Sequence, residues 1–201
     1  IWCDIYATIA SLPARPLHVI GKITDVDHEV RERERLTHLS ERDTLTGLFN
    51  KTAFHAALDS FLDDPHMSEQ HAALFFVDID HFKQLNDQLG HIAGDDAIIT
   101  IAETLKRIFR TEDIIGRFGG DEFFIFTQGI PVNILKQKAE SVCRALELNF
   151  GETVFVSASV GVFSFAGTTH SRKEILERAD EALYDAKQSG KNRYVFYSDE
   201  Q

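Results

Sequence analysis

Residues 117–126 read RFGGDEFFIF, in which a Gly-Gly pair is followed by two acids and a strongly apolar run. Glycines accept the positive φ angles that tight hairpin turns require, so DIIGRF (113–118) and DEFFIF (121–126) are predicted to form a β-hairpin. Asp121 and Glu122 then lie at the start of the second strand. Two carboxylates at this position indicate either a solvated hairpin tip or a site that holds a metal ion.

A second pair of acids follows another apolar run. AALFFVD (72–78) is predicted to be a central buried strand that brings Asp78 and Asp80 to its end. If this strand lies beside the hairpin, Asp78, Asp121 and Glu122 converge, and converging carboxylates repel one another unless a proton or cation lies between them. Oxygen ligands without nearby His or Cys favour Mg²⁺ or Mn²⁺, which complete their shell with water and substrate phosphates. The pattern therefore indicates a nucleoside triphosphate site, with solvated strand-end acids as the alternative.

The polar stretch HFKQLNDQLGHIAGDD (81–96) lies between the two acidic pairs. Lys83 follows the first pair closely, as a phosphate-facing cation should. Asn86 and Asp95 offer the amide and carboxylate groups that can read a guanine edge. The alternative is that both residues only cap helices, since Asp95 precedes a predicted helix.

The remaining chain alternates helical and strand patterns. TVFVSASVGVF (153–163) places small and branched apolar residues on one face, which predicts a half-buried strand. The order β-α-β-β-α-β predicts an α+β fold of the ferredoxin type, with a mainly antiparallel central sheet covered by helices on one side. We expect two further helices over about 51–62 and 95–110, and a third that has Pro131 as its first residue. A fourth helix is expected to start at a capping box at 171–174 and to end near Ser189. A last strand is expected over 194–197.

Composition excludes several classes of function. The 201 residues carry a formal net charge of -11, which argues against a surface for nucleic-acid polymers or anionic membranes. Cys3 and Cys143 are far apart in the chain, so neither a disulfide framework nor a cysteine zinc site is expected. The sequence shows neither a membrane-spanning apolar run nor a signal peptide, so we expect a cytoplasmic protein without direct membrane contact. Because the chain begins at Ile1 rather than methionine, we expect it to be part of a longer protein.

Five ordered segments resemble the GGDEF domain of bacterial diguanylate cyclases. The resemblance covers roughly residues 43–197, and Lys51 stands where the family usually has Arg. It implies a fold related to the palm of polymerases and nucleotidyl cyclases, and a reaction that joins two GTP into cyclic di-GMP with release of pyrophosphate. The segments are DTLTGLFNK (43–51), FVDIDHFKQLND (76–87), GHIAGDD (90–96), RFGGDEF (117–123) and YDAKQSGKNR (184–193).

The resemblance also implies a role for each acid. Asp78 and Asp121 would hold Mg²⁺ together with the backbone carbonyl of Ile79, and Asp121 would accept the proton of the attacking ribose 3′-hydroxyl. Glu122 would be either a metal neighbour or a structural acid. Two metal ions would lower the pKa of that hydroxyl and neutralise charge on the α-phosphate.

Other residues would bind the nucleotide. Lys83 and the backbone N–H groups around Phe82 would stabilise the phosphates, and Lys187 and Lys191 would reach the triphosphate from the start of the last strand. Lys191 is often Arg in the family. Asn86 and Asp95 would select guanine, with His91 nearby.

The segment RTED (110–113) resembles the RxxD product-inhibition site of the family. Arg110 would grip the guanine or phosphate of bound cyclic di-GMP, and Asp113 would pair with a guanine edge. The alternative is a helix-ending Arg and a turn Asp. The register against GGDEF favours the inhibitory site.

The amino-terminal part resembles the end of a PAS sensor domain, with strands over 4–12 and 18–26. HEVRERERLTHLSER (28–42) follows, as either a solvated connecting helix or a signalling helix that pairs with a second subunit. We therefore expect the end of a PAS-like domain over 1–27, a linker helix over 28–42 and the catalytic domain over 43–201.

The resemblance leaves rival functions open. Because one domain would bind one GTP, cyclisation requires a homodimer. The alternatives are a silent GGDEF module that binds GTP or cyclic di-GMP as a receptor, a structural dimerisation module, and a cyclase with altered nucleotide choice.

Overall fold

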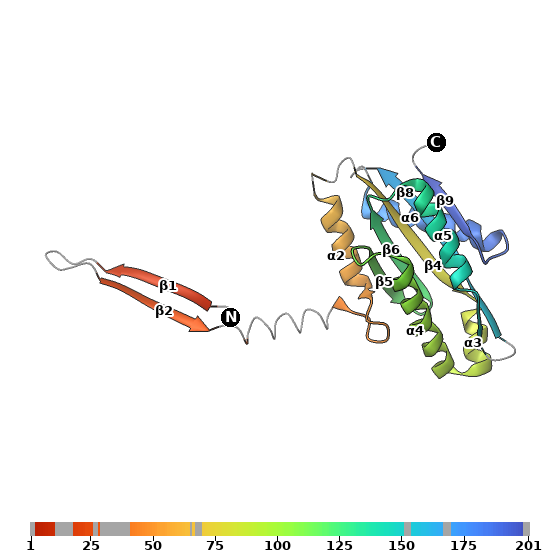
Figure 1. Cartoon of the computed structure of the whole chain (residues 1–201), viewed down its shortest axis with the longest axis horizontal. Helices are drawn as coiled ribbons and strands as arrows, with labels where there is room; N and C mark the ends of the chain where they lie inside the picture. Colours follow the sequence, from red (N-terminus) through yellow and green to blue (C-terminus); the bar gives the residue numbers. More distant parts are fainter. Residues whose placement is uncertain are drawn as a thin grey trace. The chain divides into compact units, whose positions relative to one another are not determined.

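The computed structural model describes residues 3–10, 18–25, 28, 41–64, 66, 70–150, 154–166 and 170–198. The chain divides into two compact units, Ile1–Glu41 and Arg42–Gln201 (Figure 1). In the first unit, β1 (Cys3–Ala10) pairs antiparallel with β2 (His18–Asp25). The two predicted strands are therefore confirmed, whereas the helix predicted over 28–42 lies almost entirely outside the described residues.

The described part of the second unit contains a seven-stranded, mostly antiparallel sheet with strand order β3-β5-β6-β4-β8-β7, in which β9 also pairs with β8. Among the strand pairs of the described residues, only β3·β5 and β8·β9 are parallel. The long strand β4 lies between β6 and β8, so the hairpin of β5 and β6 is placed beside it as expected (Figure 1). The strands are β3 (Phe49–Asn50), β4 (His71–Asp80), β5 (Ile114–Gly119), β6 (Glu122–Gln128), β7 (Leu148–Phe150), β8 (Val154–Ala166) and β9 (Tyr194–Ser198).

Five helices complete the described part of this unit: α2 (Lys51–Leu62), α3 (Phe82–Leu89), α4 (His91–Ile108), α5 (Val132–Ala145) and α6 (Arg172–Gln188). The capping box at the start of α6 is confirmed, because Ser171 and Glu174 each accept a hydrogen bond from the other's backbone N–H. Pro131 caps α5 in an extended conformation rather than being its first residue. None of the helices in the described ranges is long and apolar enough to cross a membrane.

Helices cover both faces of the sheet, so the expectation of cover on one side is wrong. Alternate residues of β4 enter two separate cores, because β4 is buried on both faces. Ala73, Phe75 and Val77 face the core that contains α4 and α5 residues. Leu74 and Phe76 face the core that contains α2 and α6 residues. A continuous apolar run is typical of a strand covered on both faces.

The strand β8 is likewise buried on both faces for most of its length. Val156, Val160 and Val162 are fully buried, as the alternating pattern predicts. Ser159 and Phe163, on the opposite face, are 0% and 2% exposed, so the expectation of a half-buried strand is wrong. The cause is α6, which packs closely against this second face.

The approach of α6 to β8 depends on Gly161. A Cβ at this position would lie 2.2 Å from the Ala179 carbonyl oxygen and 2.3 Å from the Leu183 backbone nitrogen. Both atoms belong to the backbone of α6 and cannot move aside as a side chain can. The glycine therefore sets the spacing between helix and strand.

We expect Gly161→Ala to lower the free energy of unfolding by roughly 1–3 kcal/mol, because the extra methyl group forces α6 away from the sheet. Urea unfolding followed by circular dichroism measures this change. Gly94→Ala is the matched control, since the atoms nearest to its Cβ belong to the end of the Asn86 side chain, which can turn away, and alanine favours the α4 helix. Equal stability of Gly161→Ala and wild type would contradict the prediction.

Candidate functional site

Three acids meet where β4 ends beside the β5–β6 turn. Asp78 lies directly opposite Glu122 in the register of β4 and β6. The Ile79 backbone N–H donates a 3.3 Å hydrogen bond to the Asp121 carbonyl oxygen. The predicted convergence of Asp78, Asp121 and Glu122 is therefore confirmed.

The turn between β5 and β6 requires its two glycines. Gly119 and Gly120 have φ angles of 139° and 52°, and the strand register shifts between Arg117 and Gly119. The Arg117 side chain closes the turn, because its Nη2 and Nε donate hydrogen bonds of 2.8 and 3.1 Å to the Gly120 carbonyl oxygen. The backbone immediately before Asp121 is therefore held by a side chain from β5.

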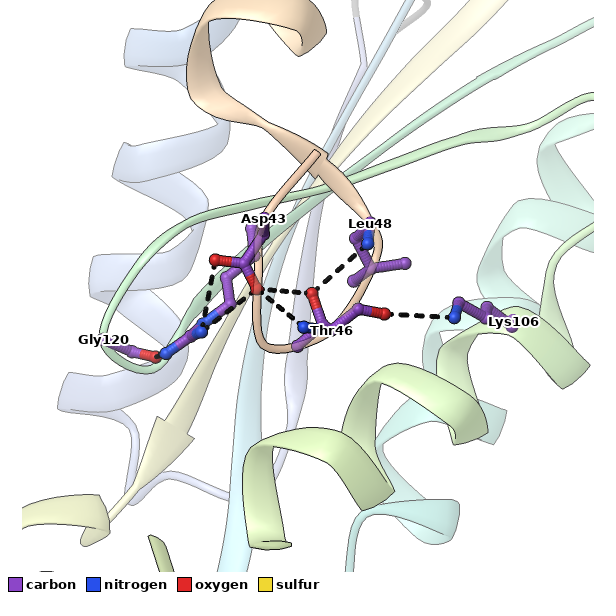
Figure 2. Close-up of polar contacts among 6 residues, drawn as sticks. Asp43, Thr46, Leu48, Lys106 and Gly120 are labelled. Carbon is purple, nitrogen blue, oxygen red and sulfur yellow. Dashed lines mark hydrogen bonds and ion pairs between the residues drawn. The ribbon is translucent and has the colours of Figure 1, made fainter. Parts of the chain in front are cut away.

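Arg117 also joins this turn to the loop formed by residues 43–48. Figure 2 shows this loop, with Asp43 and Thr46 labelled and Gly120 and Lys106 on either side. Arg117 Nη1 lies 3.2 Å from Asp43 Oδ1, which also accepts hydrogen bonds from the Thr46 backbone and hydroxyl at 2.9 and 2.7 Å. Lys106 of α4 donates a 3.2 Å hydrogen bond to the Thr46 carbonyl oxygen. Sequence reasoning missed the roles of Asp43 and Arg117, although both lie in motifs that it singled out.

Asp78 is placed where a positive charge is favoured. Its side chain is only 14% exposed, and Lys187 Nζ lies 2.9 Å from its Oδ2. Burial raises the pKa of Asp78 above its ordinary value; the Lys187 ammonium opposes this increase, whereas the charges of Asp121 and Asp80 add to it. In this structure the Lys187 ammonium neutralises the charge of the Asp78 carboxylate.

The donor set at this rim suits a hard divalent cation. Asp78 and Asp121 offer carboxylate oxygens, and Ile79 offers a backbone carbonyl. Across the described ranges, the Asp121 and Glu122 carboxylates accept no hydrogen bond from another residue. No group of three or more His, Cys, Asp and Glu side chains is arranged to hold a metal within those ranges. A metal here would therefore complete its shell with water or ligand oxygens, which is typical of Mg²⁺.

The helix α3 begins directly after these acids. His81 adopts a left-handed conformation (φ 63°), so the chain turns sharply from β4 into α3 at Phe82. The free backbone N–H groups of a helix start attract anions, and Lys83 is exposed in the first turn. The geometry places a cation and N–H donors next to the acids.

Asn86 and Asp95 lie inside α3 and α4, so the alternative that both cap helices is wrong. α4 begins four residues before Asp95, at His91, because Gly90 ends α3 and also caps α4. The two helices meet at Gly94, where a Cβ would lie 2.0 Å from Asn86 Oδ1. Because Gly94 has no side chain, the Asn86 amide can lie against this part of α4. Asp95 and His91, on the same helix, are both exposed.

Lys187 and Lys191 lie before the last strand rather than at its start. Lys187 is in the last turn of α6, and Lys191 is in the turn that leads to β9, with a φ of 61°. The structure brings Lys187 to Asp78 directly. Lys191 stays close to the end of α6, because its backbone N–H donates a 3.1 Å hydrogen bond to the Ala186 carbonyl oxygen.

Arg110 and Asp113 lie in a turn between α4 and β5. Asp113 Oδ2 accepts a 2.8 Å hydrogen bond from the Arg110 backbone N–H, so Asp113 does close a turn. It is 8% exposed, and burial raises its pKa. Arg110 lies two residues beyond the end of α4, and both residues line a hollow of about 370 Å³ that Arg42 and Lys106 also border. The turn alternative and a ligand site are therefore compatible.

The fold places this chain among known structures of one class. The crystal structure of the coiled coil and GGDEF domain of DgcB from Caulobacter crescentus in complex with c-di-GMP is 27% identical, with a TM-score of 0.78. The similarity covers 85% of this chain and 93% of that one. The mixed α+β fold is thus that of a GGDEF domain, and Asp78, Asp121 and Glu122 form an acidic rim at one edge of its sheet.

The chain belongs to the GGDEF family, because the family model described as diguanylate cyclase, GGDEF domain, matches residues 40–193. The probable diguanylate cyclase DgcC of Escherichia coli (strain K12) is 36% identical over 164 residues, which cover 80% of this chain and 44% of the relative. The cyclic di-GMP phosphodiesterase NbdA of Pseudomonas aeruginosa is 34% identical over 166 residues, which cover 81% of this chain and 21% of the relative. The chain therefore spans less than half the length of these curated relatives.

The link between Asp43 and Arg117 predicts a pH-dependent contribution to stability. Burial alone raises the pKa of Asp43, but the hydrogen bonds from Thr46 and the charge of Arg117 outweigh burial and lower it. A lowered pKa in the folded state stabilises the fold above the unfolded value of about 4, and this stabilisation is lost as the pH falls through the folded pKa. We expect Asp43→Asn to be less stable than wild type at pH 7, and the difference to shrink below about pH 4.

Urea unfolding between pH 7 and pH 3 measures this difference. Asp180→Asn is the matched control, because Asp180 is an exposed carboxylate on α6, and we expect its stability to follow wild type across the range. A constant difference between Asp43→Asn and wild type would show that the Asp43 charge is not involved.

Proposed function

We propose that this chain is a diguanylate cyclase that condenses two GTP into cyclic di-GMP and releases pyrophosphate. The observation that carries the proposal is the convergence of Asp78, Asp121 and Glu122 beside the start of α3 and Lys187. Family membership and the named diguanylate cyclases among the relatives support the same activity.

The acids would hold the metal and prepare the nucleophile. Asp78, Asp121 and the Ile79 carbonyl would bind Mg²⁺, or Mn²⁺ in its place, with Glu122 as a neighbouring acid. The bound metal supplies charge neutralisation at the α-phosphate and lowers the pKa of the ribose 3′-hydroxyl. Asp121 would accept the proton of that hydroxyl, and Arg117 would hold the turn that positions it.

The surrounding residues would bind and orient GTP. Lys83 and the N–H groups at Phe82 would contact the phosphates from the start of α3, while Lys187 and Lys191 would approach them from the end of α6 and the turn that follows. Asn86 and Asp95 would read the guanine edge, with His91 nearby. The close approach of α3 and α4 at Gly94 supports this assignment, because it keeps the Asn86 amide next to the Asp95 segment.

The reaction needs a homodimer, because each domain would bring one GTP and both 3′-hydroxyls must attack. We propose that residues 1–27 end a PAS-like sensor domain, that residues 28–42 form a linker helix and that residues 43–201 form the catalytic domain. The sensor would control the reaction through the geometry of the dimer. We propose that this chain binds no nucleic-acid polymer and makes no direct contact with a membrane. We also propose that it works in the cytoplasm.

A silent receptor module is the second candidate. One relative that contains the matching segment is a cyclic di-GMP phosphodiesterase. In such a setting a GGDEF domain could bind GTP or cyclic di-GMP without turning it over. The two candidates differ in whether Mg²⁺ and GTP yield product.

We expect this chain to convert GTP to cyclic di-GMP with Mg²⁺, at a rate that rises more steeply than linearly with protein concentration. Chromatographic separation of nucleotides measures the product. Asp121→Asn should lower turnover by about 100-fold or more, because it removes a proton acceptor and a metal ligand, and chelation with EDTA should abolish turnover. Asp180→Asn, exposed on α6, is the matched control.

Absence of product would favour the receptor module, provided that the chain has also been assayed as a forced dimer. A fused leucine zipper supplies that dimer. Binding of GTP with Mg²⁺, or of cyclic di-GMP, without turnover would then identify a silent receptor domain, whereas binding of neither nucleotide would leave only a structural role.

The hollow bordered by Arg110 is the proposed product-inhibition site. The Arg110 guanidinium is exposed and lies 3.7 Å from Glu112 Oε1, so it can turn toward a bound guanine or phosphate. Asp113 would contribute its second carboxylate oxygen, since Oδ2 already accepts the Arg110 N–H. Binding there would restrain the turn at the end of α4.

We expect Arg110→Ala to raise the cyclic di-GMP concentration for half-inhibition by at least about ten-fold and to leave initial turnover within about two-fold of wild type. Initial rates at increasing product concentration measure both quantities. Arg144→Ala, which removes an exposed arginine paired with Glu140 on α5, is the matched control. Unchanged inhibition in Arg110→Ala would remove this residue from the regulatory site.

A further inference from the structure

Asp80 is a buried carboxylate that the proposed reaction does not use. It ends β4 and is 2% exposed, although it lies only two residues from Asp78. Its Oδ2 accepts a 2.7 Å hydrogen bond from the Ser157 hydroxyl, and its Oδ1 accepts a 2.8 Å hydrogen bond from the Ser159 hydroxyl. A buried charge at this depth is costly unless several donors surround it.

The third donor comes from a different part of the chain. The Asn192 backbone N–H donates a 3.0 Å hydrogen bond to Asp80 Oδ2. Asn192 belongs to the turn formed by residues 189–193, which joins α6 to β9. One carboxylate therefore connects the end of β4, the strand β8 and this turn.

The 189–193 turn needs such a connection because its backbone is strained. Lys191 and Asn192 have φ angles of 61° and 47°, a left-handed conformation that non-glycine residues adopt at a cost. Few other interactions of Asn192 hold the turn. Its side chain donates a 2.8 Å hydrogen bond to Glu147, but both residues are exposed. The buried Asp80 thus attaches the turn to the sheet at Asn192, next to the 2.9 Å hydrogen bond that the Val160 N–H of β8 donates to the Arg193 carbonyl oxygen.

The 189–193 turn follows Lys187 closely and contains Lys191. Lys187 contacts Asp78. The turn is hydrogen-bonded to the end of α6, because the Gly190 and Lys191 N–H groups donate to the Lys187 and Ala186 carbonyl oxygens at 3.3 and 3.1 Å. Asp78 and Asp80 belong to the same end of β4. The hydrogen bond from Asn192 to Asp80 therefore ties the turn to the strand that supplies Asp78.

We propose that Asp80 is a positioning residue that fixes the 189–193 turn and so holds Lys187 and Lys191 in place for the phosphates of the nucleotide. This inference rests on the proposed function, and it deepens it by assigning to Asp80 a specific share of phosphate binding. Asp80 acts through the turn and touches neither nucleotide nor metal. A purely structural carboxylate would instead support the binding of every ligand equally.

The test compares two ligands that differ in their phosphates. We expect Asp80→Ala to weaken binding of 3′-deoxy-GTP, which lacks the attacking hydroxyl, by about ten-fold in the presence of Mg²⁺. Binding of GMP, which lacks the β- and γ-phosphates, should stay within about two-fold of wild type. Isothermal titration calorimetry of the whole chain measures both affinities.

Conservative replacement provides the rescue. In Asp80→Asn, the amide oxygen can still accept the Asn192 N–H, and we expect both the affinity for 3′-deoxy-GTP and the hydrogen-exchange protection of the Asn192 amide to return toward wild type. In Asp80→Ala, that amide should lose protection. Asn192→Gly is the matched control, because glycine tolerates the positive φ and keeps the N–H donor.

A second variant covers the case in which Asp80→Ala does not fold. Ser157→Ala combined with Ser159→Ala removes two donors that orient the carboxylate, and it should weaken 3′-deoxy-GTP binding in the same direction while sparing GMP. Equal loss of both ligands, or full protection of Asn192 in every variant, would overturn the inference. Failure of the wild type to bind 3′-deoxy-GTP at all would instead count against the proposed function.

Discussion

The second unit depends on one constraint, which is the burial of both faces of β4. Its apolar residues alternate between two cores, so a shift of one residue would exchange the contents of both. The register with β6 and β8 is therefore strongly specified. That register places Asp78 opposite Glu122 and opposite Ser159, at the point where the apolar run ends. The position of the acids follows from the packing of the strand that precedes them.

The acidic rim is costly for the apo fold, and its neighbours reduce that cost in different ways. Asp78 faces the Lys187 ammonium, whereas Asp80 is surrounded by two hydroxyls and a backbone N–H. Asp121 and Glu122 are partly exposed, and within the described residues their carboxylates accept no hydrogen bond. The same few residues thus contain one acid that is satisfied internally and others that remain available to a cation. Burial and hydrogen bonding, rather than residue type, separate the two roles.

Local patterns predicted much of this architecture because they depend on neighbouring residues. The Gly-Gly hairpin, the buried run of β4 and the capping box at Ser171 are examples, and the hairpin together with β4 was enough to bring the acids together. Partnerships across long stretches of sequence could not be predicted. Arg117 meets Asp43 across 74 residues, and Asp80 meets Asn192 across 112. Cover on both sheet faces was missed for a related reason, since the pattern of a buried strand does not say which helices return to which face.

The start of α4 shows how a local rule can mislead. Asp95 has the residue type and setting of a helix cap, yet Gly90 performs that function for α4 while it ends α3. The two helices consequently meet at Gly94, which lies within α4. With Asp95 as the cap, Gly94 would have been in a loop. A short connection between two helices is therefore decided by the residue that can adopt an unusual backbone angle, here a glycine with a φ of 84°.

The 43–48 loop has a consequence for how two distant parts of this unit respond to ligands. Gly47 and Leu48 border the hollow beside Arg110, while Asp43, through Arg117, holds the carbonyl of Gly120 next to Asp121. Lys106 contacts both the hollow and the loop. Thermodynamic linkage is reciprocal. If a ligand in the hollow changes the affinity for a ligand at the acids through this loop, the ligand at the acids changes the affinity in the hollow by the same factor.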